Sequence, residues 1–217
     1  MTATMKPSGV EGFGDIPLDW EVNRMSFTFS FGKGLSITKE DLQDEGIPSI
    51  TYGDIHSRFG FEIDPEVNEV RCVDPKYLKS GRSSLLQFGD FIFADTSEDI
   101  AGSGNFTHLN SHALAFAGYH TITARAKRTL NFRFMAYLFD SEPFRNQIRN
   151  SVSGVKVFSV TQTIIKNTRL LLPPLPEQQA IATLLDDRCG YIGGIIADLE
   201  RQMDILRQYK KALIILL

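Results

Sequence analysis

The 217-residue sequence contains only two cysteines, Cys72 and Cys189, and their positions show no paired spacing. This scarcity argues against a disulfide framework and against a cysteine-based metal centre. The opening stretch MTATMKPSGVEGFGD has no apolar core of the kind that a secretory signal requires. The longest apolar run, ALIILL, is far too short to cross a bilayer. We therefore expect a cytoplasmic protein with free thiols and no membrane association.

Motifs that support catalysis or cofactor binding are also missing. The segment AGSGNF has two glycines in G-x-G spacing, but it lacks the third glycine and the following helix of a phosphate-binding loop. The segment LPPL lacks the Asp/Asn-Pro-Pro-aromatic pattern of adenine-modifying methyltransferases, and no Gly-x-Ser-x-Gly elbow occurs. Asp95, Glu98 and Asp99 form an acidic cluster, but no lysine follows at a nuclease spacing. We expect no catalytic residues and no cofactor.

Three histidines are the candidates for a metal site. His108 and His112 have the i, i+4 spacing of a helical ligand pair, and His120 would add a third ligand. The segment HLNSHALAF, however, runs into a strand pattern, and no cysteine or acidic pair lies beside it. No metal site is predicted.

The composition is that of an ordinary globular protein, but the charges are distributed unevenly along the sequence. Its net charge is −3, with 42% hydrophobic and 23% charged residues. Residues 1–70 carry 5 Lys/Arg against 13 Asp/Glu, whereas residues 71–170 carry 13 Lys/Arg against 7 Asp/Glu. The cationic middle section hints at a polyanionic partner. On composition alone, charges spread over a solvated surface are the simpler explanation.

Residues 1–172 show short β-type segments separated by Gly and Asp turns. IPSITYGDIH predicts a strand before a Gly-Asp turn, DFIFAD predicts a second strand, and HALAFAGYHTITARA predicts a hairpin broken at Gly118. Thr38, followed by Asp41, predicts the N-cap of one helical turn. A loop docked through Trp20 is predicted near the start. These patterns favour a mixed, β-rich domain.

Two helices are predicted within the same domain, because the apolar period changes after residue 130. NFRFMAYLFDS predicts the first, and SEPFRNQIRNSV predicts a second one capped by Ser141. SGVKVFSVTQTIIKN then returns to a strand pattern. The fold class is therefore α+β, with a globular domain over residues 1–172.

Three prolines, Pro173, Pro174 and Pro176, separate this domain from a different pattern. Apolar residues then recur every seven positions in two seams, which predicts a coiled-coil-forming helix over about 176–217. At about 60 Å, this helix is too long for the domain to bury, so it needs a partner helix. The predicted helix-pairing residues are Leu185, Ile192, Ile196, Leu199, Met203, Leu206 and Leu213.

Gly193 and Gly194 lie in the middle of the predicted helix, where each glycine costs about 1 kcal/mol relative to alanine. They indicate either a close helix–helix approach, or a hinge, or a tolerated kink. The sequence leaves these alternatives open.

The junction and helix resemble a known family. LLLPPLPEQQAIATLLDD and the later YKKALI resemble the helical spacer of the specificity subunit of type I restriction-modification enzymes. Upstream, KPSGVEGFGDIPLDWEV, GIPSITYGDIHSRFG, FGDFIFADTSED and SEPFRNQI resemble its target recognition domain. The chain would thus comprise one target recognition domain, residues 1–172, and one spacer, residues 173–217.

The resemblance implies a DNA-binding subunit without catalytic residues. Each target recognition domain of the family reads one half of a split DNA sequence. The helical spacers pack together, set the distance between the half-sites and dock the methyltransferase subunits, through which the restriction subunit joins. A complete subunit usually carries two recognition domains, so we expect this chain to dimerise through its C-terminal helix or to be one half of a longer subunit.

Polar side chains of the β-rich domain are the candidates for DNA contacts. Base-edge candidates are Thr96, Ser97, Asn105, His108 and Gln162. Phosphate candidates are Arg125, Lys127, Arg128, Lys156 and Lys166. For each of them, a role as an ordinary solvated surface residue is the alternative. Two rival functions remain: a stand-alone enzyme acting on DNA, and a coiled-coil adaptor with no DNA role.

Overall fold

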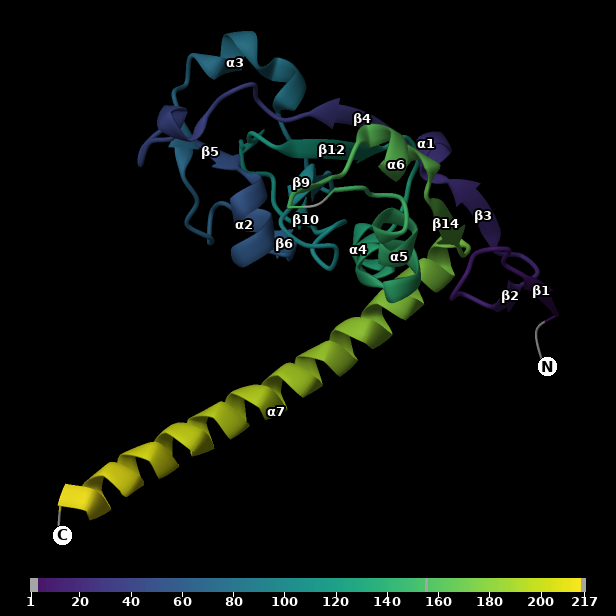
Figure 1. Ribbon diagram of the computed structural model, residues 1–217. Helices are drawn as coiled ribbons and strands as arrows, with labels where there is room; N and C mark the ends of the chain where they lie inside the picture. The colour runs from purple at the N-terminus through teal and green to yellow at the C-terminus, as the bar shows by residue number, and fades with distance from the viewer. Residues whose placement is uncertain (1–3, 155, 216–217) are drawn as a thin grey trace.

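The computed structural model describes residues 4–154 and 156–215, without the side chains of residues 212, 213 and 215. Figure 1 shows a rounded domain from which the C-terminal helix α7, Leu175–Ile215, runs outward. The class is α+β, as predicted: a sheet-rich domain followed by one long helix.

A five-stranded mixed sheet forms the centre of the domain, in the order β4-β12-β8-β10-β6. Its strands are β4 (Phe29–Lys33), β6 (Phe61–Ile63), β8 (Phe91–Ala94), β10 (Phe106–Leu109) and β12 (Thr121–Ala126). All pairs are antiparallel except β10 with β6. Strand β8 lies in the middle, and its four residues are all buried.

Alternation along β8 divides the core between the two faces of the sheet. Phe91 and Phe93 point into a cluster rich in phenylalanine, whereas Ile92 and Ala94 point into a smaller aliphatic cluster on the other side. The first cluster is covered by helices α4 (Phe132–Asp140) and α5 (Glu142–Arg149), as Figure 1 shows. The second is covered by helix α2 (Tyr52–Ser57) and neighbouring segments.

Smaller elements complete the domain. The short strands are β1 (Met5–Pro7), β2 (Asp15–Pro17), β3 (Glu21–Arg24), β5 (Ile47–Ile50), β7 (Cys72–Val73), β9 (Thr96–Ser97), β11 (Phe116–Ala117), β13 (Phe158–Ser159) and β14 (Arg169–Leu172). The short helices are α1 (Met25–Thr28), α3 (Tyr77–Ser80), α6 (Gln162–Asn167) and two 3-10 turns, η1 (Lys39–Asp41) and η2 (Arg82–Ser84). The Thr38 cap of η1 is confirmed, with its backbone N–H donating to Asp41.

Three sequence predictions differ from the structure. The predicted hairpin at Gly118 is wrong, because β11 pairs with β5 while β12 pairs with β4 and β8. The predicted Gly-Asp turn at residues 53–54 lies inside helix α2, and residues 162–167, predicted as strand, form helix α6. The last two share a cause: Thr51 and Thr161 cap helices at positions that β-branched composition made look extended.

The first turns of α7 are part of the domain. Strand β14 ends at Leu172 after pairing with β3, and the prolines turn the chain into the helix. Gln178 and Ala182 are buried against the domain, and the predicted docking of Trp20 is confirmed by its indole N–H, which donates to Glu177 at 3.0 Å. From Asp187 to Lys211, by contrast, every side chain is exposed.

Candidate nucleic-acid interface

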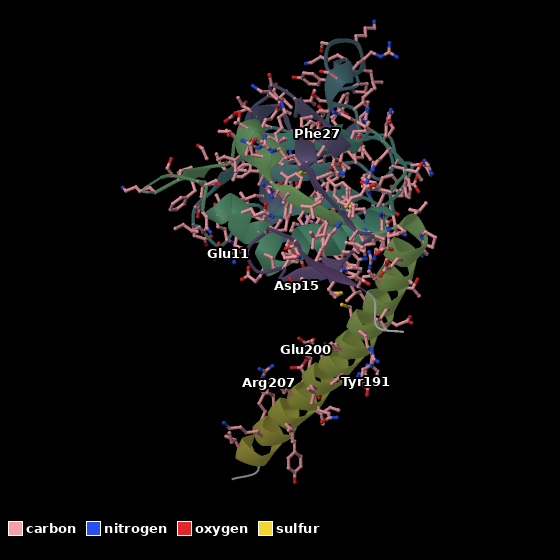
Figure 2. All side chains as sticks on the ribbon, turned by 90° about the vertical axis from the view of Figure 1, so that its right-hand side faces the viewer. Glu11, Asp15, Phe27, Tyr191, Glu200 and Arg207 are labelled. Carbon is pink, nitrogen blue, oxygen red and sulfur yellow. The ribbon has the colours of Figure 1, made fainter. Side chains whose placement is uncertain are left out.

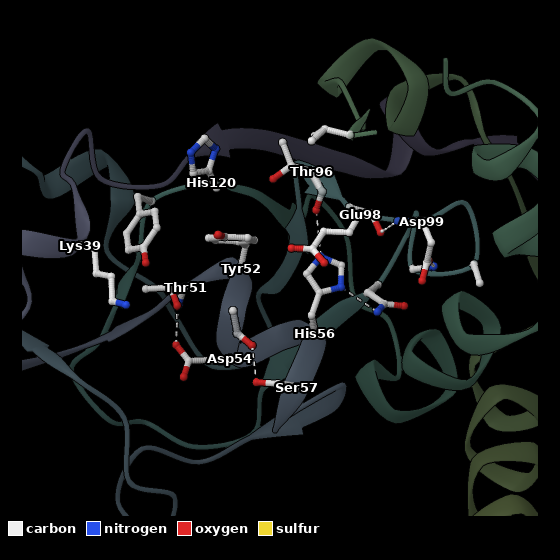
Figure 3. Close-up of a pocket in the computed structure, with 17 residues that line it drawn as sticks. Lys39, Thr51, Tyr52, Asp54, His56, Ser57, Thr96, Glu98, Asp99 and His120 are labelled. Atoms are coloured by element: carbon white, nitrogen blue, oxygen red, sulfur yellow. Dashed lines mark hydrogen bonds between the residues drawn. The ribbon is translucent and has the colours of Figure 1, made fainter. Parts of the chain in front are cut away.

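A cleft of about 1040 Å³ opens beside the N-terminus of α2 (Figure 3). Its walls are α2, the loop that follows β9, and the turn between β11 and β12. The loop belongs to the polar, glycine-containing stretch 96–111. The cleft therefore brings together three segments that are far apart in the sequence, around a set of polar side chains.

One wall of the cleft is a hydrogen-bonded chain that fixes the state of His56. Arg145 donates to Asn105 Oδ1 at 2.6 Å, so the amide nitrogen of Asn105 must face His56 Nδ1, 2.9 Å away. Nδ1 then accepts, and His56 Nε2–H donates to the Thr96 carbonyl at 2.8 Å (Figure 3). Because an arginine can only donate, the donor and the acceptor of each hydrogen bond in this series are fixed, and His56 is the neutral Nε2–H tautomer.

Aromatic rings form a second part of the cleft. The ring centroid of Tyr52 lies 5.6 Å from that of Tyr119 and 5.3 Å from that of His120, both in edge-on geometry. Burial raises the pKa of the Tyr119 phenol, which keeps its hydroxyl as a donor at neutral pH. Such a group of rings combines flat apolar faces with polar edges, which suits contact with nucleobases.

Carboxylates give the cleft an acidic character. Asp54 accepts from the backbone N–H and hydroxyl of Thr51 at 2.9 and 2.7 Å, and Asp99 accepts from the Gly102 N–H at 2.6 Å. Glu98, on the same loop, is exposed and lines the cleft (Figure 3). A carboxylate repels phosphate but accepts hydrogen bonds from the exocyclic amino groups of bases. The cleft is therefore suited to base edges and unsuited to the DNA backbone.

A second surface has the opposite charge, and we call it the basic face: Arg24, Phe27, Lys127, Lys166 and Arg169. Phe27, on α1, is 72% exposed, and Figure 2 labels it at the surface of the domain. Arg24 and Arg169 are cross-strand partners in β3 and β14, and Lys127 donates to the Ser26 carbonyl at 2.8 Å. An exposed aromatic ring on a helix whose neighbouring segments carry these cations is suited to a phosphate backbone.

The segment 156–167 connects the two surfaces. Val157 lines the cleft, β13 pairs with β9 at its wall, and α6 ends beside α1, where the Thr168 carbonyl accepts from the Met25 N–H at 2.8 Å. Lys156 is exposed at the cleft end, and Lys166 lies at the other end, 5.4 Å from the Phe31 ring. The segment 156–167 thus runs from the cleft to the basic face.

The structure brings some of the predicted DNA-binding residues together. Thr96, Ser97 and Asn105 all line the cleft, although Ser97 is buried and the amide of Asn105 is engaged by Arg145 and His56. Lys127 and Lys166 belong to the basic face. Gln162 donates to the Gly32 carbonyl at 2.9 Å and accepts from Lys166 at 3.1 Å, on the path between the two surfaces.

Other predicted contacts are tied to the protein itself. His108 requires a correction: it lies in β10, 2% exposed, where its Nδ1–H donates to the Phe61 carbonyl and burial lowers its pKa. It is not helical, so the i, i+4 metal geometry with His112 is also absent. Arg125 makes a two-bond ion pair with buried Asp90, at 2.8 and 2.5 Å, and Arg128 pairs with Glu21 at 3.1 Å.

Sequence reasoning missed several residues of both surfaces. Tyr52 and His56 were hidden because their segment resembles a strand, and Tyr119 because it was assigned to a hairpin turn. The Thr51-x-x-Asp54 capping box is the signal that would have found α2, and with it the cleft. Phe27 gives no such signal, because a buried phenylalanine and an exposed one look the same in a sequence.

The predicted helix-pairing residues share one side of α7. Ile192, Ile196, Leu199, Met203 and Leu206 are each at least half exposed, Leu185 is partly buried near the domain, and the side chain of Leu213 lies outside the described residues. A second exposed stripe adjoins them: Leu184, Tyr191, Ile195, Ile205 and Tyr209. Figure 2 shows Tyr191 and other labelled side chains projecting from the helix away from the domain.

Together the two stripes cover about 180° of the helix circumference at 3.6 residues per turn. A simple two-helix seam is narrower. Within the described residues, no helix is both long and apolar enough to span a membrane, and no group of three or more His, Cys, Asp or Glu side chains could hold a metal ion.

Known proteins similar to this chain are specificity subunits. The EcoKI type I restriction enzyme specificity subunit of Escherichia coli K12 is 21% identical over 208 residues, covering 93% of this chain and 43% of that protein. The MjaVIII subunit of Methanocaldococcus jannaschii is 22% identical over 207 residues, covering 94% and 46%. This chain therefore spans less than half the length of these curated relatives.

The fold is shared with solved structures of the same kind. The crystal structure of the HsdS subunit from Thermoanaerobacter tengcongensis superposes with a TM-score of 0.59 at 16% identity, covering 85% of this chain and 40% of that one. The family model described as "Type I restriction modification DNA specificity domain" matches residues 17–201, from the domain well into α7. The chain belongs to the type I restriction-modification DNA specificity family.

Proposed function

We propose that this chain is a DNA sequence-recognition subunit of a type I restriction-modification enzyme, without catalytic residues of its own. Residues 1–172 form a target recognition domain that reads one half of a bipartite target. Residues 173–217 form a helical spacer that pairs with a second helix and docks methyltransferase subunits and, through them, a restriction subunit. The cytoplasm is the expected compartment.

The observation that carries the proposal is the continuity of the family match across the junction. Residues 17–201 include the polar cleft and the exposed apolar stripes of α7 as far as Leu199. A recognition surface and an exposed helix in one chain are what a subunit needs when it must read DNA and also hold other subunits at a set distance.

The two surfaces of the domain divide the work of DNA binding. The basic face and the path along α6 contact phosphates, which position the duplex but carry no sequence information. The acidic, aromatic cleft reads base edges, with Glu98 as an acceptor for an exocyclic amino group. The low net charge of the chain is compatible with this division, because residues 71–170, which lie within the domain, carry 13 Lys/Arg against 7 Asp/Glu.

The two stripes of α7 support two kinds of partner. The seam of Ile192, Ile196, Leu199, Met203 and Leu206 suits one antiparallel helix, from a second copy of this chain or from a second half-subunit. The adjoining stripe of Leu184, Tyr191, Ile195, Ile205 and Tyr209 would remain exposed in such a pair. It therefore offers an apolar surface for the methyltransferase subunit.

The test is DNA binding by the complex reconstituted with its methyltransferase subunits. The Lys127→Ala/Lys166→Ala double variant should weaken binding to all sequences and lower the salt slope by about 2. Glu98→Gln should instead change the preference at one base pair by about tenfold, which corresponds to the 1–3 kcal/mol of a good base contact. Glu11→Gln, an exposed carboxylate that does not line the cleft, is the matched control. Binding that depends on neither salt nor sequence would refute the proposal.

Two further outcomes would favour the rival functions. Methylation or cleavage by the isolated chain with DNA, Mg²⁺ and S-adenosylmethionine would indicate a stand-alone enzyme. Self-association without DNA binding, even when the methyltransferase subunit is supplied, would indicate an assembly adaptor.

A further inference from the structure

The direction of α7 is set by polar contacts along its first turns. Glu177 binds Trp20, and buried Gln178 accepts from the Asn131 N–H at 3.0 Å while donating to the Pro173 carbonyl at 2.8 Å. Two turns further on, Asp186 accepts from Arg133 Nε at 2.6 Å and from the Tyr137 hydroxyl at 2.7 Å. Among the described residues, Asp186 is the last residue of α7 that the domain partly buries.

The Asp186 contact links three elements of the fold. Arg133 and Tyr137 come from α4, and Arg133 also forms an ion pair with Glu62 in β6. The guanidinium lies 4.9 Å from the Phe61 ring centroid and 5.6 Å from that of Tyr137, beside two rings whose own centroids are 5.0 Å apart. The central sheet, helix α4 and helix α7 therefore meet at the guanidinium of Arg133. We call Arg133 and its partners Glu62, Tyr137 and Asp186 the Asp186 clamp.

The protonation states of Asp186 and Tyr137 determine which clamp residues donate hydrogen bonds and which one accepts them. Burial alone would raise the pKa of Asp186, but the hydrogen bonds from Tyr137 and Arg133 hold that pKa below its usual value. Burial, followed by the Asp186 hydrogen bond, raises the pKa of the Tyr137 phenol. At neutral pH, the carboxylate accepts and both partners donate. Charged hydrogen bonds of this kind require defined distances and angles, whereas apolar side chains can slide over one another.

The helix beyond the clamp acts as a lever. From Asp186 to Ile215 it extends for about 43 Å at the standard rise. A change of about 5° in its direction would move the far end by about 4 Å, which is close to the rise of one base pair in B-DNA. A small change at the clamp would therefore alter the separation of two recognition domains by one step of the target.

We propose that the Asp186 clamp is a positioning device that determines the spacer length between the two half-sites which the assembled enzyme accepts. This inference rests on the proposed function and deepens it. Arg133, Tyr137 and Asp186 are not among the residues that line the cleft; they act by fixing the angle between the domain and α7. The half-site sequence is read by the domain, and the distance between half-sites depends on the paired helices and on the angle that this junction fixes.

The first experiment measures methylation by the reconstituted complex on a DNA pool in which the half-sites are separated by different numbers of base pairs. Asp186→Ala should lower the ratio of preferred to adjacent spacing several-fold, and Tyr137→Phe should do so less. Asp187→Ala, the exposed neighbouring aspartate with the same loss of charge, should leave the ratio unchanged. The half-site sequence should be the same for all four proteins. An unchanged spacing profile in Asp186→Ala would overturn the inference.

A second experiment tests the clamp without DNA. Spin labels at Glu11→Cys and Arg201→Cys, in a Cys189→Ser background, report the distance between the domain and α7. The distance distribution should broaden in Asp186→Ala and not in Asp187→Ala, while thermal unfolding of the domain stays within a few degrees of the parent. Equal distributions would overturn the clamp even if DNA recognition is confirmed. Broadening without any sequence-specific DNA binding would leave the clamp standing and refute the proposed function instead.

Discussion

Phe139 on α4 and Leu199 on α7 are both large apolar residues on helices, yet their surroundings are opposite. Phe139 is fully buried, with its ring centroid 4.7 Å from those of both Phe91 and Phe144. Leu199 is 53% exposed and lies in a stretch where every side chain faces outward. The domain therefore satisfies its apolar surface internally, whereas the outer part of α7 depends on other chains or segments.

This difference separates stability from assembly. Residues of the domain contribute to the free energy of unfolding of a single chain, because burial occurs within that chain. Residues of α7 beyond the clamp contribute only when a partner covers them. Substitutions in the two regions should therefore change different measured quantities, and the predictions below use that separation.

The largest effect is expected from Phe139→Ala. Removing this ring from the phenylalanine cluster should lower the free energy of unfolding by about 3–5 kcal/mol. Leu199→Ala should change it by less than about 0.5 kcal/mol, because its side chain makes no contact with the domain. Urea unfolding at low protein concentration measures both values. Comparable losses for the two variants would mean that α7 and the domain unfold as a single unit.

Leu199→Lys should weaken self-association without changing the stability of the domain. In the proposed helix pair it places an unpaired charge in the seam, which should weaken self-association by about 2–4 kcal/mol. Sedimentation equilibrium measures the association, and urea unfolding should show an unaltered domain. Gln208→Lys adds the same charge on the opposite side of α7 and serves as the control. Equal association of the wild type and Leu199→Lys would exclude this seam.

Arg125→Ala should affect folding more than phosphate binding. Its guanidinium neutralises Asp90, which is 1% exposed, so the variant leaves a buried carboxylate unpaired. We expect a loss of about 2–3 kcal/mol, at the lower end for a buried pair because Arg125 itself is 40% exposed. Lys127→Ala, two residues along and exposed, should leave the midpoint of thermal unfolding in place. An unaltered midpoint for Arg125→Ala would return this residue to the phosphate candidates.

Gly193→Ala should have the smallest effect. An added methyl group meets no atom of this chain within 4 Å, so the free helix should gain about 1 kcal/mol of helical stability. Circular dichroism of the chain would register the gain. If association weakens at the same time, the glycine permits close approach of a partner helix; if association is unchanged or stronger, it is a tolerated kink or hinge.

The sequence predicted the parts of the fold that depend on regular periodicity. Helices α4, α5 and α7 follow from apolar spacing, and Trp20 docks as expected. The pairing of β11 was not predictable in the same way. Gly118 looks like a turn residue, but its real constraint is the close approach of β5, since an added Cβ would lie 2.9 Å from the Ile50 carbonyl oxygen. That neighbour is distant in the sequence.

The candidate site was predicted only in part, for a related reason. Thr96, Ser97 and Asn105 could be found because they belong to a polar loop, and loops carry function. Whether a side chain is free to bind DNA depends on its partners in space. Arg125 and His108 are committed to Asp90 and to Phe61, which no local pattern reveals. Residues of the same polar and basic types therefore include candidates for DNA contact and residues that bond only within the protein.

The pairing of β14 with β3 has a consequence for synthesis of the protein. Strand β3 appears at residues 21–24, but its partner is the last strand before the helix, at residues 169–172. On the ribosome, the domain cannot close until nearly all of it has been made. Until then, strand β3 has no partner strand. The next segment to emerge is α7, so its apolar stripes become exposed only after the domain that anchors them is able to fold. The order of the chain thus places this association surface after the domain that carries it.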